Sequence, residues 1–142
     1  MKIFKSTILV LLSATILFIL CSCTAVRFGD IGDVQITKAE SHIYTQDEID
    51  SAIKTIKNYF KLNFGGCKLL AIGYAGDDSA KEAKEWAQTY GSDKAIILIS
   101  DFEVDSSGGD GSLNPNSTYT EWKWILVKDN NGLWKHADHG YG

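Results

Sequence analysis

The sequence predicts an α+β fold, in which a curved antiparallel sheet packs on an N-terminal helix and a second, shorter helix. Three observations favour this class: a capped amphipathic pattern from about residue 45 to 63, apolar stretches of strand length near residues 67–74 and 94–105, and a hairpin pattern over residues 120–141. A chain of 142 residues is long enough to bury one core of ordinary size. We therefore expect a single globular domain over residues 41–142.

Residues 1–22 have the pattern of a secretory signal peptide. Lys2 and Lys5 precede an apolar run, Ile8–Cys21, which is followed by Ser22 and Cys23. The residues Leu20-Cys21-Ser22-Cys23 resemble the lipobox of bacterial lipoproteins. This resemblance implies that Cys23 becomes the lipidated first residue and joins the protein to the membrane.

An uncleaved membrane helix is the alternative for this segment. Ser6–Val26 contains no charged residue and approaches the roughly 20 apolar residues that a bilayer requires. Both alternatives place Lys2 and Lys5 on the cytoplasmic side and the domain outside. We expect the protein at the cell membrane, lipid-anchored, with its domain on the extracytoplasmic face.

The charge and cysteine content exclude several classes of function. Removing residues 1–22 removes two lysines and no acidic residue, so the formal net charge falls from −4 to −6. An acidic domain of this kind binds nucleic acid poorly. Cys67 is the only cysteine besides Cys23 in the mature part, which excludes an internal disulfide and a zinc finger. We interpret Cys67 as a small apolar residue at the start of a strand, and we expect no cofactor.

Residues 23–40 are expected to form a flexible tether, because they contain Gly29, Gly32 and few large apolar residues. Within this segment only Val34-Gln35-Ile36 favours order, as a short edge strand.

The first helix has the clearest local signal in the chain. Thr45 fits the N-cap and Glu48 completes a capping box, while Tyr44 is placed to meet Ile49 across the cap. Apolar residues then recur at helical spacing until the paired glycines at 65 and 66 end the helix. These residues are Ile49, Ala52, Ile53, Ile56 and Phe60.

The remaining elements follow in alternation. Residues 67–74 read as a strand, and Ser79 with Glu82 forms a second capping-box pattern before a short helix that Gly91 ends. Residues 94–105 predict the central strand. A Gly-, Ser- and Asn-rich loop, residues 106–118, precedes the hairpin, whose Asn131-Gly132 pair predicts a type I′ turn.

Four carboxylates near the end of the central strand are weak candidates for a metal site. Asp101, Glu103 and Asp105 are expected on one strand face, and Asp110 follows in the loop. Oxygen ligands of this kind suit Ca²⁺, but the spacing does not match an EF-hand loop. A solvated outer face is the simpler explanation of the pattern, and we predict no metal here.

The last strand carries the only candidate for acid–base chemistry. His136 and Asp138 share one face if the strand alternates regularly, and His139 points to the other. A His–Asp pair of this kind serves as a base and its orienting partner.

Three tryptophans of the hairpin are candidate ligand or partner contacts. Trp122 and Trp124 share a strand face with Leu126, while Ile125 and Val127 occupy the other face. Trp134 lies on the returning strand. Aromatic anchors are typical of binding sites, and additional core is the alternative.

The order of elements and the sequence Gly132-Leu133-Trp134-Lys135 resemble the nuclear transport factor 2-like and cystatin-like group. Within it the chain is similar to small secreted lipoproteins of Gram-positive bacteria that have no assigned function. The resemblance covers about residues 41–142 and implies a curved sheet around the first helix. The chain departs from the group in having one strand between the helices, and no catalytic dyad of the group maps onto it.

Three functions are compatible with these observations. The first is a lipoprotein whose domain binds a small ligand or an envelope protein without catalysis. The second is a small hydrolase, isomerase or dehydratase that uses His136 and Asp138. The third is a cystatin-like protease inhibitor, for which the 108–115 loop is the only candidate wedge.

Overall fold

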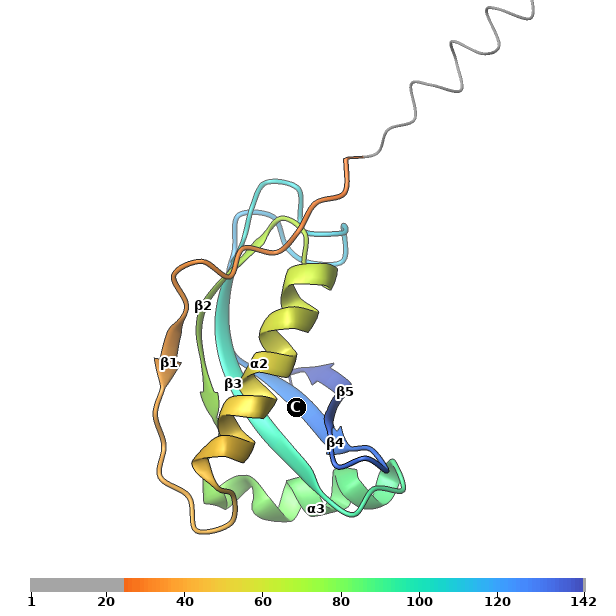
Figure 1. Cartoon of the computed structure of the whole chain (residues 1–142). Coiled ribbons are helices and arrows are strands. Elements are labelled where there is room, and N and C mark those ends of the chain that lie inside the picture. The colour runs from red at the N-terminus through yellow and green to blue at the C-terminus, as the bar shows by residue number, and fades with distance from the viewer. Residues whose placement is uncertain (1–24, 142) are drawn as a thin grey trace, which may run out of the picture.

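The structure is a computed structural model that describes residues 25–141, so the predicted signal segment and Cys23 lie outside the described residues. The described residues form an α+β fold with one five-stranded, mostly antiparallel open sheet and two helices (Figure 1). In chain order the elements are β1 (Gln35–Thr37), α2 (Gln46–Asn63), β2 (Cys67–Tyr74), α3 (Ala80–Thr89), β3 (Ala95–Val104), β4 (Thr118–Lys128) and β5 (Trp134–Gly140). Between residues 25 and 141, none of the helices has the length and apolarity needed to cross a bilayer.

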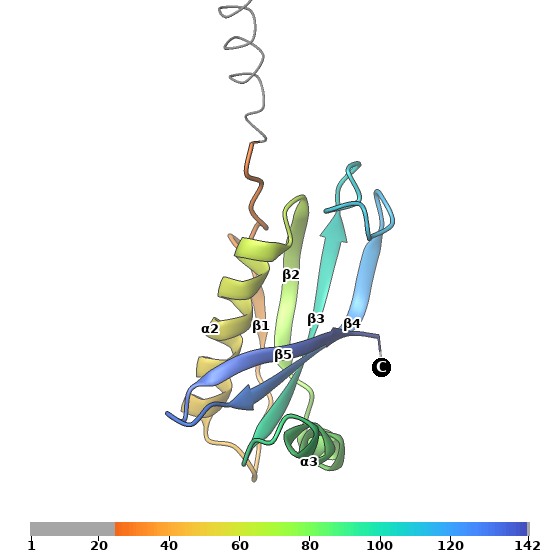
Figure 2. The same cartoon turned by 90° about the vertical axis from the view of Figure 1, so that its right-hand side faces the viewer.

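The strands lie in the order β1-β2-β3-β4-β5. β1 is parallel to β2, and the other neighbours are antiparallel. β3 is therefore the central strand, as predicted. The sheet bends so that β4 and β5 reach toward α2 (Figure 2).

The predicted cap of α2 is confirmed. The Oγ1 atom of Thr45 accepts from the backbone N–H of Glu48 at 3.2 Å, and the N–H of Thr45 donates to Glu48 Oε2 at 3.1 Å. The second carboxylate oxygen of Glu48 accepts from Lys94 and Lys128, each at 2.7 Å. The capping residue thus also joins α2 to the ends of β3 and β4.

The core has two parts on opposite faces of the sheet. α2 covers one face, where Phe60, Trp124 and Leu126 are fully buried. α3 covers part of the other face, where Ala83 and Ala87 pack with apolar residues of β3. Figure 2 shows the two helices on opposite sides of the sheet. The expected assignment of Trp122 and Trp124 to one face and Val127 to the other is confirmed.

The second predicted capping box is wrong. Ser79 has helical backbone angles (φ −77°, ψ −4°) at the end of a 3₁₀ turn, Asp77–Ser79, and its hydroxyl donates to Gly76 O at 2.7 Å. An N-cap needs an extended backbone, which this turn does not provide. Glu82 instead pairs with Lys123 of β4. The predicted stop at Gly91 is confirmed by its φ of +62°.

Most of the expected tether is a structured edge of the domain. The N–H of Gly29 donates to Lys61 O at 2.9 Å, and Asp30 forms a bridge with Lys68 of β2. Arg27 forms an ion pair with Asp105. The predicted edge strand exists as β1. Gly29, one of the two glycines that suggested flexibility, permits close packing instead, because a Cβ on it would lie 2.5 Å from Phe60 O.

The turn of the β4–β5 hairpin is not type I′. Gly132 has a positive φ of 76°, whereas Asn131 does not, and a type I′ turn needs both. The carboxylate of Asp129 accepts from the N–H groups of Asn131 and Leu133, both at 2.9 Å. This side-chain acceptor stabilises a longer loop that the Asn-Gly pair alone did not indicate.

Candidate functional site

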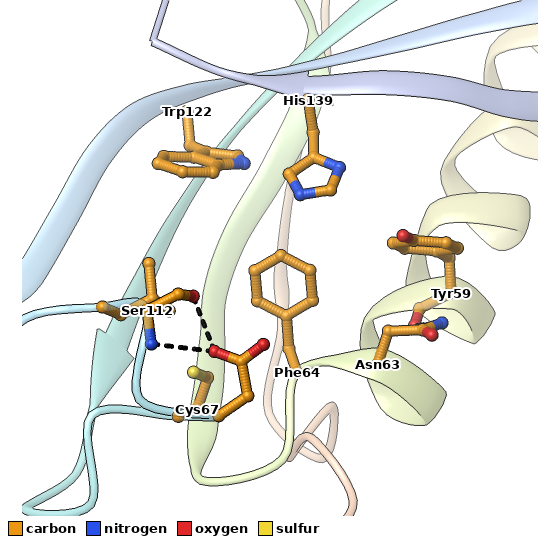
Figure 3. A pocket seen from close by; sticks show the side chains of 10 residues that line it. Tyr59, Asn63, Phe64, Cys67, Ser112, Trp122 and His139 are labelled. Atoms are coloured by element: carbon orange, nitrogen blue, oxygen red, sulfur yellow. Dashed lines mark hydrogen bonds between the residues drawn. The ribbon is translucent and has the colours of Figure 1, made fainter.

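A pocket of about 280 Å³ opens between the C-terminal end of α2, the loop after β3 and the β4–β5 hairpin (Figure 3). Its walls combine aromatic rings with a few polar groups from these separate segments. The aromatic members are Tyr59, Phe64, Trp122 and His139, and the polar ones are Asn63, Asp110 and Ser112.

The aromatic rings form a continuous wall. The ring centroids of Tyr59 and Phe64 are 6.4 Å apart, those of Phe64 and His139 are 5.5 Å apart, and those of His139 and Trp122 are 5.9 Å apart. Tilted and edge-on contacts at these separations are favourable for aromatic pairs. These contacts between the rings therefore hold the wall in place in the absence of a ligand.

Two histidines of β5 meet beside this wall. His136 Nε2 and His139 Nδ1 are 2.9 Å apart, within hydrogen-bonding distance. The His136 ring stacks on Tyr59 with a centroid separation of 3.9 Å, which fixes it against α2. The remaining nitrogen of His139 points into the pocket (Figure 3).

Burial holds this pair in the neutral form. It lowers the pKa of His136 to about 4, with a further lowering from the neighbouring His139 that Asp138 partly opposes. Burial also lowers the pKa of His139. Because a neutral imidazole has one donor and one acceptor, the direction of the bond between the rings sets the role of His139 Nε2. It donates if Nδ1 accepts from His136, and it accepts if Nδ1 donates.

A β-bulge brings the two histidines together. Asp138 pairs with Ile125, and His136 pairs with Leu126, so Ala137 is the additional residue of β5. Its carbonyl accepts from the hydroxyl of Tyr90 at 3.2 Å, beyond the end of α3. A bulge shifts the alternation of side chains by one position, which places both histidines on the α2 side.

The expected pairing of His136 with Asp138 on one face is consequently wrong. Asp138 borders a separate depression on the α3 side with Trp86 and Lys123. Its Oδ1 accepts from the backbone N–H of His139 at 2.8 Å. Of the two residues proposed for acid–base chemistry, His136 lies behind the pocket and Asp138 faces away from it.

Two of the three candidate tryptophans are core residues, so the expectation that they contact a ligand is wrong. Trp124 has no exposed surface and its Nε1 donates to Ser100 Oγ at 2.7 Å. Trp134 is 5% exposed and its Nε1 donates to Glu48 O at 3.0 Å. Trp122 differs, since it is half-buried, lines the pocket, and has an Nε1 atom that lacks a hydrogen-bond partner among the described residues.

The four carboxylates considered for calcium do not converge. Asp101 accepts from the N–H of Glu121 at 2.9 Å, and Asp110 accepts from Ser112. The hydroxyl and N–H of Ser107, with Arg27, hold the pKa of Asp105 at about 2. Glu103 is exposed on its strand. Across residues 25–141, no three His, Cys, Asp or Glu side chains are arranged to hold a metal ion.

Cys67 lies at the base of the pocket, at the first position of β2, as predicted. It is 3% exposed, and burial raises the pKa of its thiol to about 11. A thiol with this pKa is protonated at neutral pH and is a poor nucleophile. Its role in the pocket is therefore that of an apolar wall.

Sequence reasoning missed the contribution of α2 to the site. Tyr59 and Asn63 are four residues apart and so share a helix face beside the apolar stripe, a spacing that is visible in the sequence. Phe64 is the C-cap residue of α2. What relates these residues to His139 is the long-range packing of α2 on β5, for which the sequence has no local signal.

Comparison of the chain with protein-family models, with curated proteins and with solved structures finds no match.

Proposed function

We propose that this protein is an extracytoplasmic lipoprotein, anchored through Cys23, whose domain binds a small ligand in the pocket without transforming it. One observation carries the binding proposal: the aromatic pocket has one polar ring nitrogen directed into it and, in its wall, a buried donor without a partner among the described residues. Trp122 Nε1 has no partner among residues 25–141, and His139 has one ring nitrogen directed into the cavity. Burying a polar group without a partner is costly, so a ligand that pairs with either group would gain affinity.

The proposed fold relationship is to the nuclear transport factor 2-like and cystatin-like group. Its support is the packing of α2 against the bent antiparallel part of the sheet, with the end of α2 beside the last strand. Ligand sites are concave and combine apolar or aromatic walls with a few placed polar groups. This pocket is concave with aromatic walls, and its lining is rich in polar groups.

Ligand-observed NMR with the full chain in nonionic detergent tests the binding proposal. A library of small amines, carboxylates, sugars and aromatic compounds is screened first. We expect at least one class to bind, and Trp122→Phe or His139→Gln to weaken it several-fold. Trp86→Phe on the α3 face is the matched control and should bind normally. Ligands that bind Trp122→Phe and His139→Gln as well as the unchanged protein would place binding elsewhere.

Membrane attachment requires its own experiment. In a Gram-positive host grown with a labelled fatty acid, the unchanged chain should incorporate label and fractionate with membranes. Cys23→Ser should abolish the label, and Cys21→Ser should not. Label that persists in Cys23→Ser would contradict the proposed lipidation site.

A second candidate function is general base chemistry by His139, because its imidazole is neutral and hydrogen-bonded to His136. Neutral histidine that an adjacent group orients is the usual form of a catalytic base. A reaction of this type would be abolished in His139→Gln, a much larger effect than the several-fold weakening of ligand binding. The cystatin-like alternative is less favoured, since Leu113 of the 108–115 loop packs against the core instead of forming a projecting wedge.

A further inference from the structure

We propose that the pocket selects a ligand that carries an alkylated ammonium group, such as a trimethylammonium. This inference rests on the proposed binding function and names the chemical class of the ligand. It is argued from the ring arrangement, the charges at the pocket and the state of the histidines.

The pocket is lined by aromatic rings, whose π-systems attract positive charge. Neighbouring rings are inclined to each other, by 59° between Tyr59 and Phe64 and by 65° between Phe64 and His139. Trp122 continues the wall on the other side of His139. Four aromatic rings, those of Tyr59, Phe64, His139 and Trp122, therefore border one small space. Alkylated ammonium ions bind in such surroundings through cation–π attraction, most strongly when they are desolvated.

A carboxylate completes the site. Asp110 Oδ1 accepts from the N–H of Ser112 at 2.9 Å and from its hydroxyl at 2.6 Å. Oδ2 makes no hydrogen bond to the described residues. The two bonds from Ser112 lower the pKa of Asp110, so the carboxylate is ionised at neutral pH. It is held at the pocket with one oxygen available to a cation.

Among the described residues, no lysine or arginine lines the pocket. Burial keeps both histidines neutral at pH 7. A carboxylate or phosphate ligand would face Asp110 without a compensating cation, which is unfavourable at close range. The pocket therefore discriminates against anions.

A second, larger groove of the domain differs from the pocket in the residues that line it. This groove of about 590 Å³ lies between β1 and α2 and is bordered by Lys38, Lys54 and Lys57. Its apolar members are aliphatic, including Ile36 and Ile53, and no aromatic ring lines it. The combination of aromatic rings with an unopposed carboxylate belongs to the pocket beside His139 and not to this larger groove.

The test compares choline with 3,3-dimethylbutan-1-ol, its uncharged isostere, on the full chain in nonionic detergent at pH 7.5. NMR titration should give a dissociation constant for choline at least tenfold below that of the isostere, and acetate should not bind. Asp110→Asn and Trp122→Phe should each weaken choline at least threefold. Asp33→Asn, which makes the same charge change at an exposed site far from the pocket lining, should have no effect.

The outcomes separate this inference from the proposed function. Equal affinity for choline and the isostere, or unchanged choline affinity in Asp110→Asn, overturns the ammonium inference. Binding of another ligand class without any ammonium compound overturns it and leaves the binding function standing, whereas binding of no class contradicts both. Comparison of choline with glycerophosphocholine then distinguishes a free ammonium compound from a lipid headgroup, and preferential binding of either supports the inference.

Discussion

His136 and His139 meet ring to ring, with Nε2 and Nδ1 2.9 Å apart, although residues three positions apart on a regular strand face opposite sides of a sheet. The additional residue at Ala137 makes the contact geometrically feasible. Tyr59 stacks on one ring, and the pocket borders the other. Burial at this position disfavours the protonated form of both imidazoles.

Acid should destabilise the domain through this pair. The folded-state pKa of His136 is about 4, against 6.5 for the unfolded chain. Between these values the unfolded state binds more protons, so the free energy of unfolding falls as the pH drops from 6.5 to 4. We expect His136 to account for about 1–3 kcal/mol of this loss. Urea unfolding of His136→Phe, which keeps a ring on Tyr59, should show a weaker pH dependence over this interval.

His42→Gln is the control for this experiment, because His42 is exposed and lies outside the site. Its pH dependence should match that of the unchanged protein. If the free energy of unfolding of His136→Phe falls with decreasing pH as steeply as that of the unchanged protein, groups other than His136 bind the protons. At neutral pH the variant is expected to lose some stability, since His139 Nδ1 loses its partner.

Ser100→Ala should destabilise the protein by about 1–3 kcal/mol, because it leaves Trp124 Nε1 without its acceptor in a fully buried place. Trp122→Phe offers the comparison. Its Nε1 has no partner in the described structure, so the change removes an unpaired donor and should cost less than Ser100→Ala. Chemical denaturation of both variants measures the difference, and a larger loss in Trp122→Phe would refute this assignment.

Glu48→Gln should cost about 1–2 kcal/mol, because the carboxylate accepts from two lysine ammonium groups and takes part in the cap of α2. These hydrogen bonds help to lower the pKa of Glu48 to about 2, although burial opposes them. Its stabilisation is therefore present above pH 4.5 and is lost as the pH falls toward 2. Thermal unfolding of both variants checks this prediction. Glu103→Gln, on the exposed side of β3, is the control and should leave the stability nearly unchanged.

Gly73→Ala should detach β1 from the sheet. A Cβ at this position would lie 2.6 Å from Thr37 O and 2.7 Å from Thr37 Cβ, and the backbone of β1 cannot yield without losing its pairing. We expect a loss of about 1–3 kcal/mol and faster tryptic cleavage at Lys38. In Gly32→Ala the new Cβ meets only an Asp30 side-chain oxygen at 3.3 Å. In this variant tryptic cleavage at Lys38 should proceed at the rate of the unchanged protein. Equal cleavage rates in Gly73→Ala and Gly32→Ala would contradict the pairing of β1 with β2.

The elements that the sequence predicted well are those with local signals. Thr45 and Glu48 form the predicted box, Gly91 ends α3, and the continuous apolar run before Phe102 is the buried half of the central strand. Each depends on residues close together in the chain. The faces of Trp122, Trp124 and Val127 also followed from alternation along one unbroken stretch of β4.

The site could not be predicted in the same way, because it depends on a one-residue irregularity. Nothing around Ala137 distinguishes it from its neighbours, and the bulge depends on pairing with β4 and contact with Tyr90. One additional residue exchanges the faces of everything after it, so His139 joined the α2 side and Asp138 left it. Likewise, Gly29 resembled a linker glycine because the tight contact with Phe60 is formed across 31 residues of sequence.

If Cys23 carries the proposed lipid, the contacts of Arg27 would limit the distance between the domain and the membrane. With a lipid on Cys23, three residues would separate the anchor from Arg27, and the four steps from residue 23 to residue 27 would reach at most about 14 Å. Arg27 lies against Gly65 and pairs with Asp105. Gly65 lies in the sequence between Phe64 and Cys67, which both line the pocket. In a protein anchored in this way, the pocket would lie close to the lipid headgroups. A small molecule could reach it there, whereas a bulky partner would have little room to approach.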